Sequence, residues 1–487
     1  MNAPLRPSIN GRFGHASSAS RWRKRIFARF STRLPVTPWS VPDTCSPTGW
    51  VSRRSSSDKT ADVSALQPRL RSAQAAAGAA FVLLALSTLN SKIAGSLWGI
   101  TFIVTAILAA RARPWPAADA LDRIARLWVI ATTLGLTCWI ASAAFWDELY
   151  PQHSAEINAG LRLVTGALAA YWLTRVVRFT PSARASHALT LALSIACVVA
   201  LLVMQLIQER DYLPIHAIAW ASGIGLIIVL LVARAADSNQ SARSRAVAAL
   251  GVLAGALAIL GSQSRGVYPV IVWCIAVLLA SWYRRSASRA RVLIASALSG
   301  LAIAIGLAVA IAHPSDPLRL REAITSVQQV RDTQQYNTPT GARLYLFTLA
   351  WQTFKDSPWV GVGAQNRLAL IRGSGLGESE AKAAALWHVR DLGHVHNAYL
   401  HHGMDGGLIS LLGFLLPLGA LALMAIRLRS QHPASALQMW GILFVHSVSN
   451  LTSVNFAHNY YALMLVISVA LVLVQARLAG SRLPRPR

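Results

Sequence analysis

The sequence has few charged residues and few cysteines. Only 13% of its 487 residues are charged, 54% are hydrophobic, and the mean hydropathy is +0.44. Repeated apolar runs about long enough to cross a bilayer exclude an ordinary soluble domain. The four cysteines (Cys45, Cys138, Cys197 and Cys274) show no CxxC spacing. They indicate neither a disulfide framework nor a zinc site, and we interpret them as unpaired and structural.

Acidic residues are scarce: 19 Asp and Glu stand against 46 Lys and Arg, a formal net charge of +27. Such an excess often indicates a nucleic-acid partner. Here, however, the basic residues lie in the N-terminal tail and in short links between apolar segments, which is typical of the cytoplasmic side of membrane proteins. The sequence therefore favours membrane lipid as a partner and not nucleic acid.

The first 72 residues contain no apolar core of the kind that a secretion signal needs. They are rich in Arg, Ser and Pro, and we predict a disordered, basic cytoplasmic tail over residues 1–72. Its Arg21–Arg33 stretch is suited to contact with anionic lipid. A start codon assigned too far upstream explains the same composition.

From Ala73 onward about twelve apolar segments have the length of membrane spans. Three arginines (Arg162, Arg175 and Arg178) lie near the ends of the fourth segment, which makes it the least typical. The predicted fold class is an all-α integral membrane protein, with spans one to nine in residues 73–312 and spans ten to twelve in 397–477. The segments lie at 73–90, 93–110, 125–145, 157–177, 187–207, 214–233, 246–262, 266–283, 291–312, 397–425, 435–452 and 458–477.

Alternate links between these segments differ in charge. One set carries most of the arginines, and the other is poor in cations, with the acidic stretch WDELYPQHSAE (146–156) as an example. Since arginine-rich links stay in the cytoplasm, both termini, including a short tail at 478–487, are predicted to be cytoplasmic. The long loop 313–396 then faces outward, which in a bacterial inner membrane is the periplasm, where ATP is absent.

The loop itself is predicted to be folded. Residues 321–336 and 341–358 show helical spacing of apolar side chains. After them, GVGAQN (361–366) is predicted to be a turn and RGSGLGES (372–379) a mobile segment. The latter does not indicate a nucleotide site, because no strand precedes it.

A histidine-rich segment, residues 388–410, leads from the loop into the tenth span. His394, His396 and Asn397 are expected near the membrane surface, where a neutral imidazole can take a proton from a hydroxyl group. Asn397 is also a good helix cap, so a purely structural role for its neighbour His396 is the alternative. A metal site is not predicted, because His401 and His402 would point about 100° apart on a helix.

Two arginines are candidates for binding an anion at the outer surface. Arg265 follows Gln263 in SQSRG, at the outer junction of spans seven and eight, and Arg343 begins the second loop helix. Two guanidinium groups can bind a lipid-borne phosphate or pyrophosphate bidentately. The alternatives are a snorkelling cation at a helix end for Arg265 and a solvated helix cation for Arg343.

Small residues follow the histidines in the tenth span. Gly403, Gly406, Gly407 and Ser410 are spaced by three and four positions. This spacing predicts a face on which another span approaches closely and holds the histidine end rigidly.

These motifs resemble the O-antigen ligase family, whose superfamily also includes O-antigen polymerases and O-linked oligosaccharyltransferases. The family pattern combines an arginine in a loop helix, a D-x-P-x-x-G-x-G stretch, and H-N-x-x-L followed by a glycine. The matching residues in this sequence are Arg343, then Asp356, Pro358, Gly361 and Gly363, then His396, Asn397, Leu400 and Gly407. The resemblance covers about residues 260–410.

The resemblance implies an inverting glycosyltransferase that works without a metal or another cofactor. Its donor would be a glycan on undecaprenyl pyrophosphate, and its acceptor a sugar hydroxyl of lipid A–core. Arg265 and Arg343 would bind the donor pyrophosphate, and His396 would deprotonate or orient the acceptor. The residues expected to support them are Gln263, His394, Asn397 and Tyr399.

Several alternatives remain at this point. A polymerase or a protein O-oligosaccharyltransferase would use the same donor. A twelve-span transporter is suggested only by PAADALDRIAR (116–126), which has alanine where the transporter loop motif has glycine. A non-catalytic assembly partner would leave the positions of His396 and Arg265 unexplained.

Overall fold

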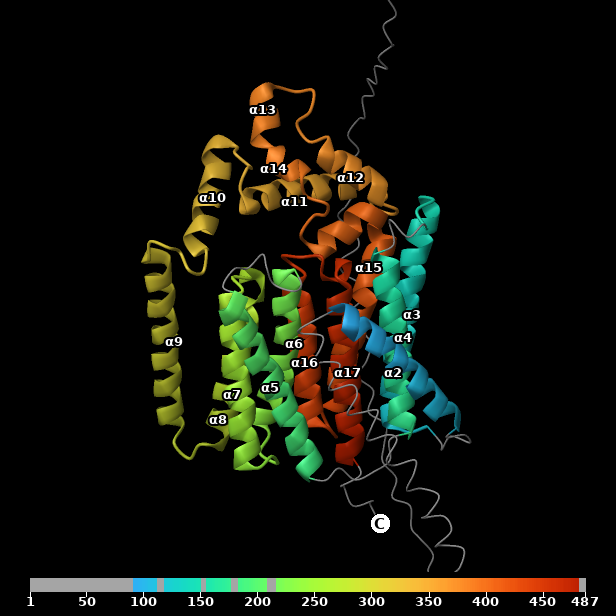
Figure 1. Ribbon diagram of the computed structural model, residues 1–487, viewed down its shortest axis with the longest axis vertical. Coiled ribbons are helices and arrows are strands. Elements are labelled where there is room, and N and C mark those ends of the chain that lie inside the picture. Colours follow the sequence, from blue (N-terminus) through green and yellow to red (C-terminus); the bar gives the residue numbers. More distant parts are fainter. Residues whose placement is uncertain (1–90, 112–117, 150–154, 177–182, 208–215, 481–487) are drawn as a thin grey trace, which may run out of the picture. The chain divides into compact units, whose positions relative to one another are not determined.

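The computed structural model describes residues 91–111, 118–149, 155–176, 183–207 and 216–480. All regular elements within these ranges are helices (Figure 1). The predicted tail (1–72), the first predicted span (73–90) and most of the C-terminal tail lie outside the described residues.

Long helices occupy the positions of predicted spans two to twelve. Within the described residues, eight helical segments are long and apolar enough to cross a membrane: those of α3, α5 to α9, α15 and α17. These helices identify a multi-pass membrane protein, whereas the total of twelve spans remains a prediction. The long helices are α2 (Ser91–Arg111), α3 (Ala120–Phe145), α4 (Ala155–Val176), α5 (Ala183–Ile207), α6 (Ala217–Ala236), α7 (Ala242–Gly261), α8 (Tyr268–Arg285), α9 (Arg289–Ala312), α15 (Ala398–Leu428), α16 (Pro433–Ser449) and α17 (Asn459–Gly480).

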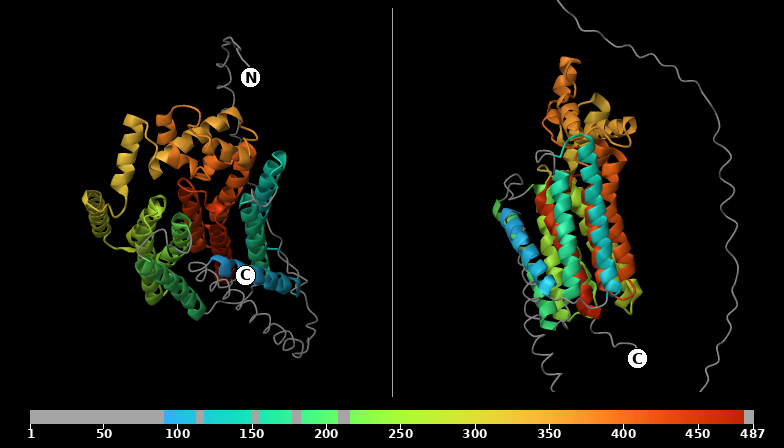
Figure 2. Two further views of the ribbon diagram at one scale, coloured as in Figure 1. Left: turned by 45° about the horizontal axis from the view of Figure 1, so that its top comes forward. Right: turned by 90° about the vertical axis from the view of Figure 1, so that its right-hand side faces the viewer.

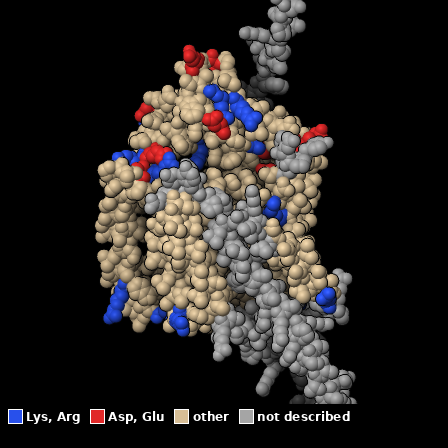
Figure 3. All heavy atoms as spheres, viewed as in Figure 1, with Lys and Arg blue, Asp and Glu red and all other residues tan. Residues whose placement is uncertain are grey.

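The long helices differ in how much of their surface the protein covers. Every residue in the apolar stretch of α6 is buried, as are 89% of those in α17, compared with 6% in α9. The exposed face of α9 is apolar, with Leu293, Leu298 and Leu301 all more than half exposed. A helix of this kind is suited to contact with lipid, and in Figure 3 Lys and Arg on the visible face gather near the two ends of the helices. Helices α6 and α17 therefore form the centre of the helix bundle.

Five shorter helices lie beyond the end of the long helices at which α9 ends and α15 begins, here called the loop end (Figures 1 and 2). The two predicted loop helices are present as α10 and α11, and three further helices were not predicted. A cluster of buried apolar side chains, including Leu346, Ile371 and Met404, joins the loop to the start of α15. The loop helices are α10 (Leu320–Thr333), α11 (Pro339–Asp356), α12 (Ala364–Arg372), α13 (Glu380–Ala385) and α14 (Trp387–Arg390).

Helix α15 is broken near its start, where a continuous span was predicted. Gly406 and Gly407 have non-helical backbone angles, and Gly407 has φ +58°. At the break, backbone N–H and C=O groups of α15 lack partners within the helix. Residues 358–363 cross the helix at this point and form hydrogen bonds with these groups. Val362 and Gly363 donate to the Met404 and Asp405 carbonyls at 2.9 and 2.8 Å, while Leu408 N–H donates to the Pro358 carbonyl at 2.7 Å.

Glycine allows this crossing because the two backbones approach so closely. A Cβ at Gly361, which has φ +62°, would lie 2.6 Å from the Asp405 carbonyl carbon. A Cβ at Gly407 would lie 2.6 Å from the carbonyl oxygens of Pro358 and Trp359. Gly361 and Gly407, two of the three glycines of the predicted family pattern, therefore shape the junction between loop and helix.

The predicted small-residue face on α15 is confirmed in part, because Gly406 and Ser410 contact α3 whereas Gly403 and Gly407 contact the loop. A Cβ added to Gly413 would lie 2.9 Å from the Gly135 carbonyl oxygen, and one added to Gly406 would overlap the Ser142 side chain. Trp139 Nε1 donates to the Ser410 carbonyl at 3.1 Å across the same contact. Helix α3 thus packs directly on the broken part of α15.

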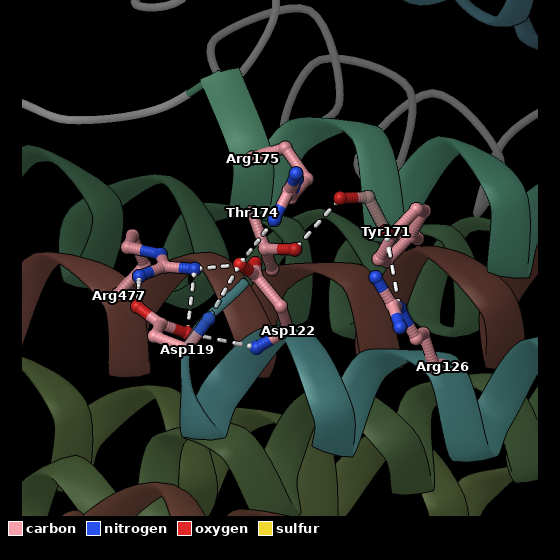
Figure 4. A network of polar contacts seen from close by, with 7 residues as sticks. All are labelled: Asp119, Asp122, Arg126, Tyr171, Thr174, Arg175 and Arg477. Carbon is pink, nitrogen blue, oxygen red and sulfur yellow. Dashed lines mark hydrogen bonds and ion pairs between the residues drawn. The ribbon is translucent and has the colours of Figure 1, made fainter. Parts of the chain in front are cut away.

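At the end away from the loop, α3, α4 and α17 are joined by an ionic network around the buried side chains of Asp122 and Arg175 (Figure 4). Asp119 and Asp122 form a reciprocal cap at the start of α3, with N–H to carboxylate distances of 3.0 and 3.1 Å. The Asp122 carboxylate pairs with Arg175 at 2.8 Å and with Arg477 at 2.6 Å, and Arg477 also pairs with Asp119. Asp119 and Asp122, in the described part of the transporter-like segment, therefore have a structural role in joining three helices.

Replacing Asp122 with alanine is expected to destabilise the protein by about 3–5 kcal/mol, because two guanidinium groups lose a buried carboxylate. Thermal unfolding of the purified protein in detergent measures this loss. Glu378→Ala is the matched control, since Glu378 and Lys382 form an ion pair that is about half exposed and therefore screened. Equal melting temperatures for the two variants would contradict the role assigned to the network.

Candidate functional site

The start of α15 is fixed by Asn397, which caps the helix. Its side-chain oxygen accepts from Leu400 N–H at 3.1 Å, and its amide donates to the Leu451 carbonyl at 3.2 Å. Ala398 N–H donates to the Asn450 carbonyl at 2.8 Å. The predicted supporting residue Asn397 therefore pins the helix to the turn that follows α16.

His396 precedes this cap in a conformation that side chains rarely adopt. Its φ is +59°, in the left-handed region, and only 8% of the residue is exposed. The backbone N–H of His396 donates to His394 Nδ1 at 3.2 Å, and the centroids of the two imidazole rings lie 4.0 Å apart. His396 Nδ1 is buried and has no hydrogen-bond partner among the described residues.

The surroundings of His396 favour its neutral form. Burial and, to a smaller extent, the neighbouring basic groups Arg343, His216 and His458 together lower the pKa of the His396 imidazole to about 3. Burial and the neighbouring His396 also lower the pKa of His394. The imidazole of His396 is thus neutral at neutral pH, and Arg343 of α11 is one of the groups that lower its pKa.

Arg265 lies at the same end of the helices, in the short helix η3 (Arg265–Val267) between α7 and α8. Its guanidinium donates to the backbone carbonyl of Arg319, at the connection between α9 and α10. The adjacent Gly266 packs against Thr452 in the turn that also binds Asn397. Arg265 and His396 therefore flank one turn, whereas a direct meeting of Arg265 with Arg343 stays a prediction.

The remaining predicted supporting residues have mainly structural contacts. Gln263 lies in the turn before η3 with φ +53°, and its carbonyl accepts from Arg265 N–H at 3.1 Å. Tyr399 donates from its hydroxyl to the Ser447 carbonyl at 3.2 Å, and its ring packs against Phe414. These contacts hold the residues around Arg265 and His396 in place.

The sequence analysis did not predict an ionic cluster around His401. His401 Nε2 lies 3.1 Å from Glu156 Oε1 and 3.5 Å from Asp405 Oδ2, and Arg367 Nε lies 2.6 Å from Asp405 Oδ1. The i,i+4 spacing of His401 and Asp405 was the available signal. Because Glu156 and Arg367 come from distant segments, the full cluster could not be inferred from spacing.

The ligand atoms of Glu156, His401 and Asp405 lie within 4.8 Å of one another, a grouping that can hold a cation. In this arrangement the imidazole bridges both carboxylates, and Arg367 neutralises Asp405. These contacts link the four groups into one polar network, and His394 and His396 are not members of it. We therefore assign the cluster to joining α4, α12 and α15.

A second carboxylate attaches the loop to the membrane helices. Glu148, which follows α3, accepts from the N–H groups of Ala364 and Gln365 at 2.7 and 2.8 Å and so caps α12. A Cβ at Gly363 would lie 2.9 Å from this carboxylate. Trp146 donates to the Val360 carbonyl at 2.7 Å. The segment after α3 thus holds the crossing residues 358–363 and α12 beside α15.

Comparison with known proteins gives a family for the part of the chain that carries these groups. Residues 250–415 match the family model described as O-antigen ligase. The matched residues run from α7 to the broken part of α15 and include Arg265, Arg343 and His396. No curated protein matches the chain. The family match confirms the resemblance predicted from the motifs and supports the O-antigen ligase family for this protein.

Proposed function

We propose that the protein is an O-antigen ligase. It moves a glycan from undecaprenyl pyrophosphate to a sugar hydroxyl of lipid A–core, at the periplasmic face of a bacterial inner membrane. The observation that carries the proposal is a buried, neutral His396 influenced by Arg343, inside a chain segment that matches the ligase family. The family match supports glycosyl transfer of the ligase or polymerase type, and the donor, the acceptor and the side of the membrane are part of the proposal.

In the proposed reaction His396 accepts the proton of the acceptor hydroxyl as its oxygen attacks the anomeric carbon. The bond between that carbon and the pyrophosphate oxygen breaks, and the pyrophosphate leaves with the electron pair. Attack from the face opposite the leaving group inverts the configuration of the anomeric carbon. Arg343 and Arg265 stabilise the negative charge that develops on the leaving group.

The proposed orientation rests on charge. The ends of the long helices opposite the loop carry Arg234, Arg284, Arg285, Arg427 and Arg477 in short links and helix ends. An end rich in arginine is typical of the cytoplasmic side. The loop end, with His396, would then face the periplasm, where a lipid-linked pyrophosphate donor requires no nucleotide.

The same donor would serve a polymerase or a protein O-oligosaccharyltransferase. A reconstituted assay distinguishes them: purified protein receives one undecaprenyl-pyrophosphate glycan together with lipid A–core, with a second lipid-linked glycan, or with an acceptor peptide. A ligase transfers to lipid A–core. Transfer only to the lipid-linked glycan or only to the peptide would replace the proposed acceptor, and no transfer to any acceptor would contradict glycosyl transfer itself.

The lowered pKa of His396 predicts an unusual pH profile. Since a lowered pKa keeps the imidazole neutral as the pH falls, kcat/KM for transfer should stay nearly constant between pH 7.5 and 5.5. A histidine with its ordinary pKa near 6.5 would be only about one-tenth neutral at pH 5.5. Donor binding is measured at each pH as the control. A tenfold fall in kcat/KM centred near pH 6.5, with donor binding unchanged, would contradict the assignment.

Arg265→Lys is expected to reduce transfer by about tenfold or more, because a point charge cannot replace a planar guanidinium that binds two oxygens. Arg331→Lys, at an exposed arginine of α10, is the matched control. Both variants are compared at equal expression in the reconstituted assay. An unchanged rate for Arg265→Lys would favour the alternative of a snorkelling cation at a helix end.

A further inference from the structure

The turn that follows α16 contains several buried polar side chains. It comprises residues 449–455, is here called the α16 turn, and leads into the short helix η4 (Asn455–Ala457). The side chains of Ser449, Asn450, Ser453 and Asn455 have no exposed surface. Most turns lie on the protein surface, where water satisfies their backbone groups. A turn that is buried to this extent must supply hydrogen-bond partners from within the protein.

The side chain of Asn450 fixes the shape of the α16 turn. Its Oδ1 accepts from Asn455 N–H at 3.2 Å, and its Nδ2 donates to the His446 carbonyl at 2.7 Å. Asn455 Nδ2 donates in turn to Ser449 Oγ at 2.7 Å. Since both polar atoms of the Asn450 side chain bind groups at the two ends of the turn, this side chain holds the turn closed.

The backbone of the α16 turn holds the start of α15. The Asn450 carbonyl accepts from Ala398 N–H at 2.8 Å, and the Leu451 carbonyl accepts from the Asn397 amide at 3.2 Å. Ala398 begins α15, so its N–H has no partner within that helix. Both contacts directly follow His396, whose φ is +59°. A left-handed conformation at such a residue persists only where the surrounding structure fixes it.

The α16 turn also contacts η3, the short helix that begins with Arg265. A Cβ added to Gly266 would overlap the Thr452 side chain, so the two segments touch without space for a larger residue. The turn therefore contacts η3 on one side and the start of α15 on the other. Its shape sets the position of His396 relative to Arg265.

We propose that Asn450 is a positioning residue for glycan transfer. By fixing the α16 turn, it holds the His396 imidazole in place and at a set distance from η3. This role rests on the proposed function, in which His396 accepts the proton of the acceptor hydroxyl. Asn450 lies outside residues 250–415, so the family match does not assign it.

The expected effect is on the rate of transfer more than on substrate binding. A general base must lie within hydrogen-bond reach of the hydroxyl, and a displacement of about 1 Å can cost about a hundredfold in rate. The side chain of Asn450 is fully buried beneath the backbone that it holds, so it is not placed to contact a substrate. Its removal should therefore lower kcat more than it changes KM.

The first test compares Asn450→Ala with the wild type in the reconstituted assay. Gln438→Ala is the matched control, because Gln438 is also a buried amide of α16 but lies near the other end of the helix, where it donates to the Leu230 carbonyl at 3.2 Å. Both variants should have a lower melting temperature. Only Asn450→Ala should lower kcat, by about tenfold or more. A folded Asn450→Ala protein with the kcat of the wild type would overturn the proposal.

A second test displaces the α16 turn without changing Asn450. Gly266→Ala should push the turn away from η3, because the added methyl group overlaps Thr452, and should lower kcat by about tenfold or more. Thr452→Gly removes the overlapping atoms, so the double variant should regain most of the lost rate. A double variant as slow as Gly266→Ala would overturn the proposed link between the turn and η3.

A third test follows the imidazole of His396 itself and requires no glycan transfer. Diethylpyrocarbonate modifies accessible histidines, and peptide mass spectrometry gives the rate at each position. His396, which is 8% exposed, should react about fivefold faster in Asn450→Ala than in the wild type or in Gln438→Ala, a factor that corresponds to about one lost hydrogen bond. The exposed His313 should react equally in all three proteins. An unchanged rate at His396 would contradict its positioning by Asn450.

The outcome is separable from that of the proposed function. Glycan transfer that depends on His396 but is unaffected by Asn450→Ala would leave the ligase proposal in place and remove the positioning role. Faster modification of His396 in Asn450→Ala, in a protein that transfers glycan to no acceptor, would keep the placement of His396 by Asn450 and remove the ligase proposal.

Discussion

Replacing His396 with alanine is expected to abolish glycan transfer, a loss of about a hundredfold to ten-thousandfold, while the protein still inserts and folds. The expected loss is that of a general base removed from a proton-transfer step. Purified variant and wild type are compared in the reconstituted assay, with the melting temperature measured in parallel. Near-normal transfer by the folded variant would remove His396 from the mechanism.

The unusual backbone of His396 calls for a second variant. Because φ is +59°, alanine introduces backbone strain as well as removing the imidazole. Asparagine tolerates this conformation and lacks a basic nitrogen, so His396→Asn tests the chemistry alone. His313→Ala, at an exposed histidine that ends α9, is the matched control. If asparagine restores transfer, the role of His396 is conformational.

Replacing Gly407 with alanine is expected to detach the loop from α15 and to lower the free energy of unfolding by about 3 kcal/mol or more. The φ of +58° strains an alanine by about 1–2 kcal/mol, and its Cβ would overlap the backbone of Pro358 and Trp359. Thermal unfolding and limited proteolysis of residues 358–397 measure the effect. Glycan transfer should also fall, because the loop no longer holds its position on α15.

Variants at two other glycines distinguish the effect of backbone strain from that of steric overlap. Gly377 has φ +79° but open space around it, so Gly377→Ala tests strain alone. Gly419 lies in the later part of α15 with an ordinary φ and no atom within 4 Å of an added Cβ. The melting temperature should fall most for Gly407→Ala, less for Gly377→Ala and least for Gly419→Ala. A Gly407→Ala protein as stable as Gly419→Ala would contradict the crossing of residues 358–363 over α15.

The sequence predicts the helices better than their junctions. Apolar runs and arginine-rich links are local signals, and they place α3 to α9 and α15 to α17 within a few residues of the observed bounds. Helices α10 and α11 follow from helical spacing in the same way. The break at Gly406 and Gly407 depends on the distant segment 358–363, so the three-and-four spacing predicted only a smooth packing face.

The candidate site shows the same division. His396, Asn397 and Arg343 were predicted as site residues from a motif. The structure adds that Arg343 lowers the pKa of His396. Glu148, Glu156 and Arg367 were missed, because each acts on a partner far away in the chain. Pairing of distant polar groups is fixed by tertiary packing, which periodicity and composition do not encode.

The measurement that tests the central proposal most directly is a lipopolysaccharide gel from a strain lacking this protein, with the lipid-linked glycan pool analysed alongside. A ligase predicts bare lipid A–core together with long glycan chains accumulated on undecaprenyl pyrophosphate. Core bearing a single repeat unit would instead indicate a polymerase. An unchanged ladder with an unchanged lipid-linked pool would contradict the proposed function.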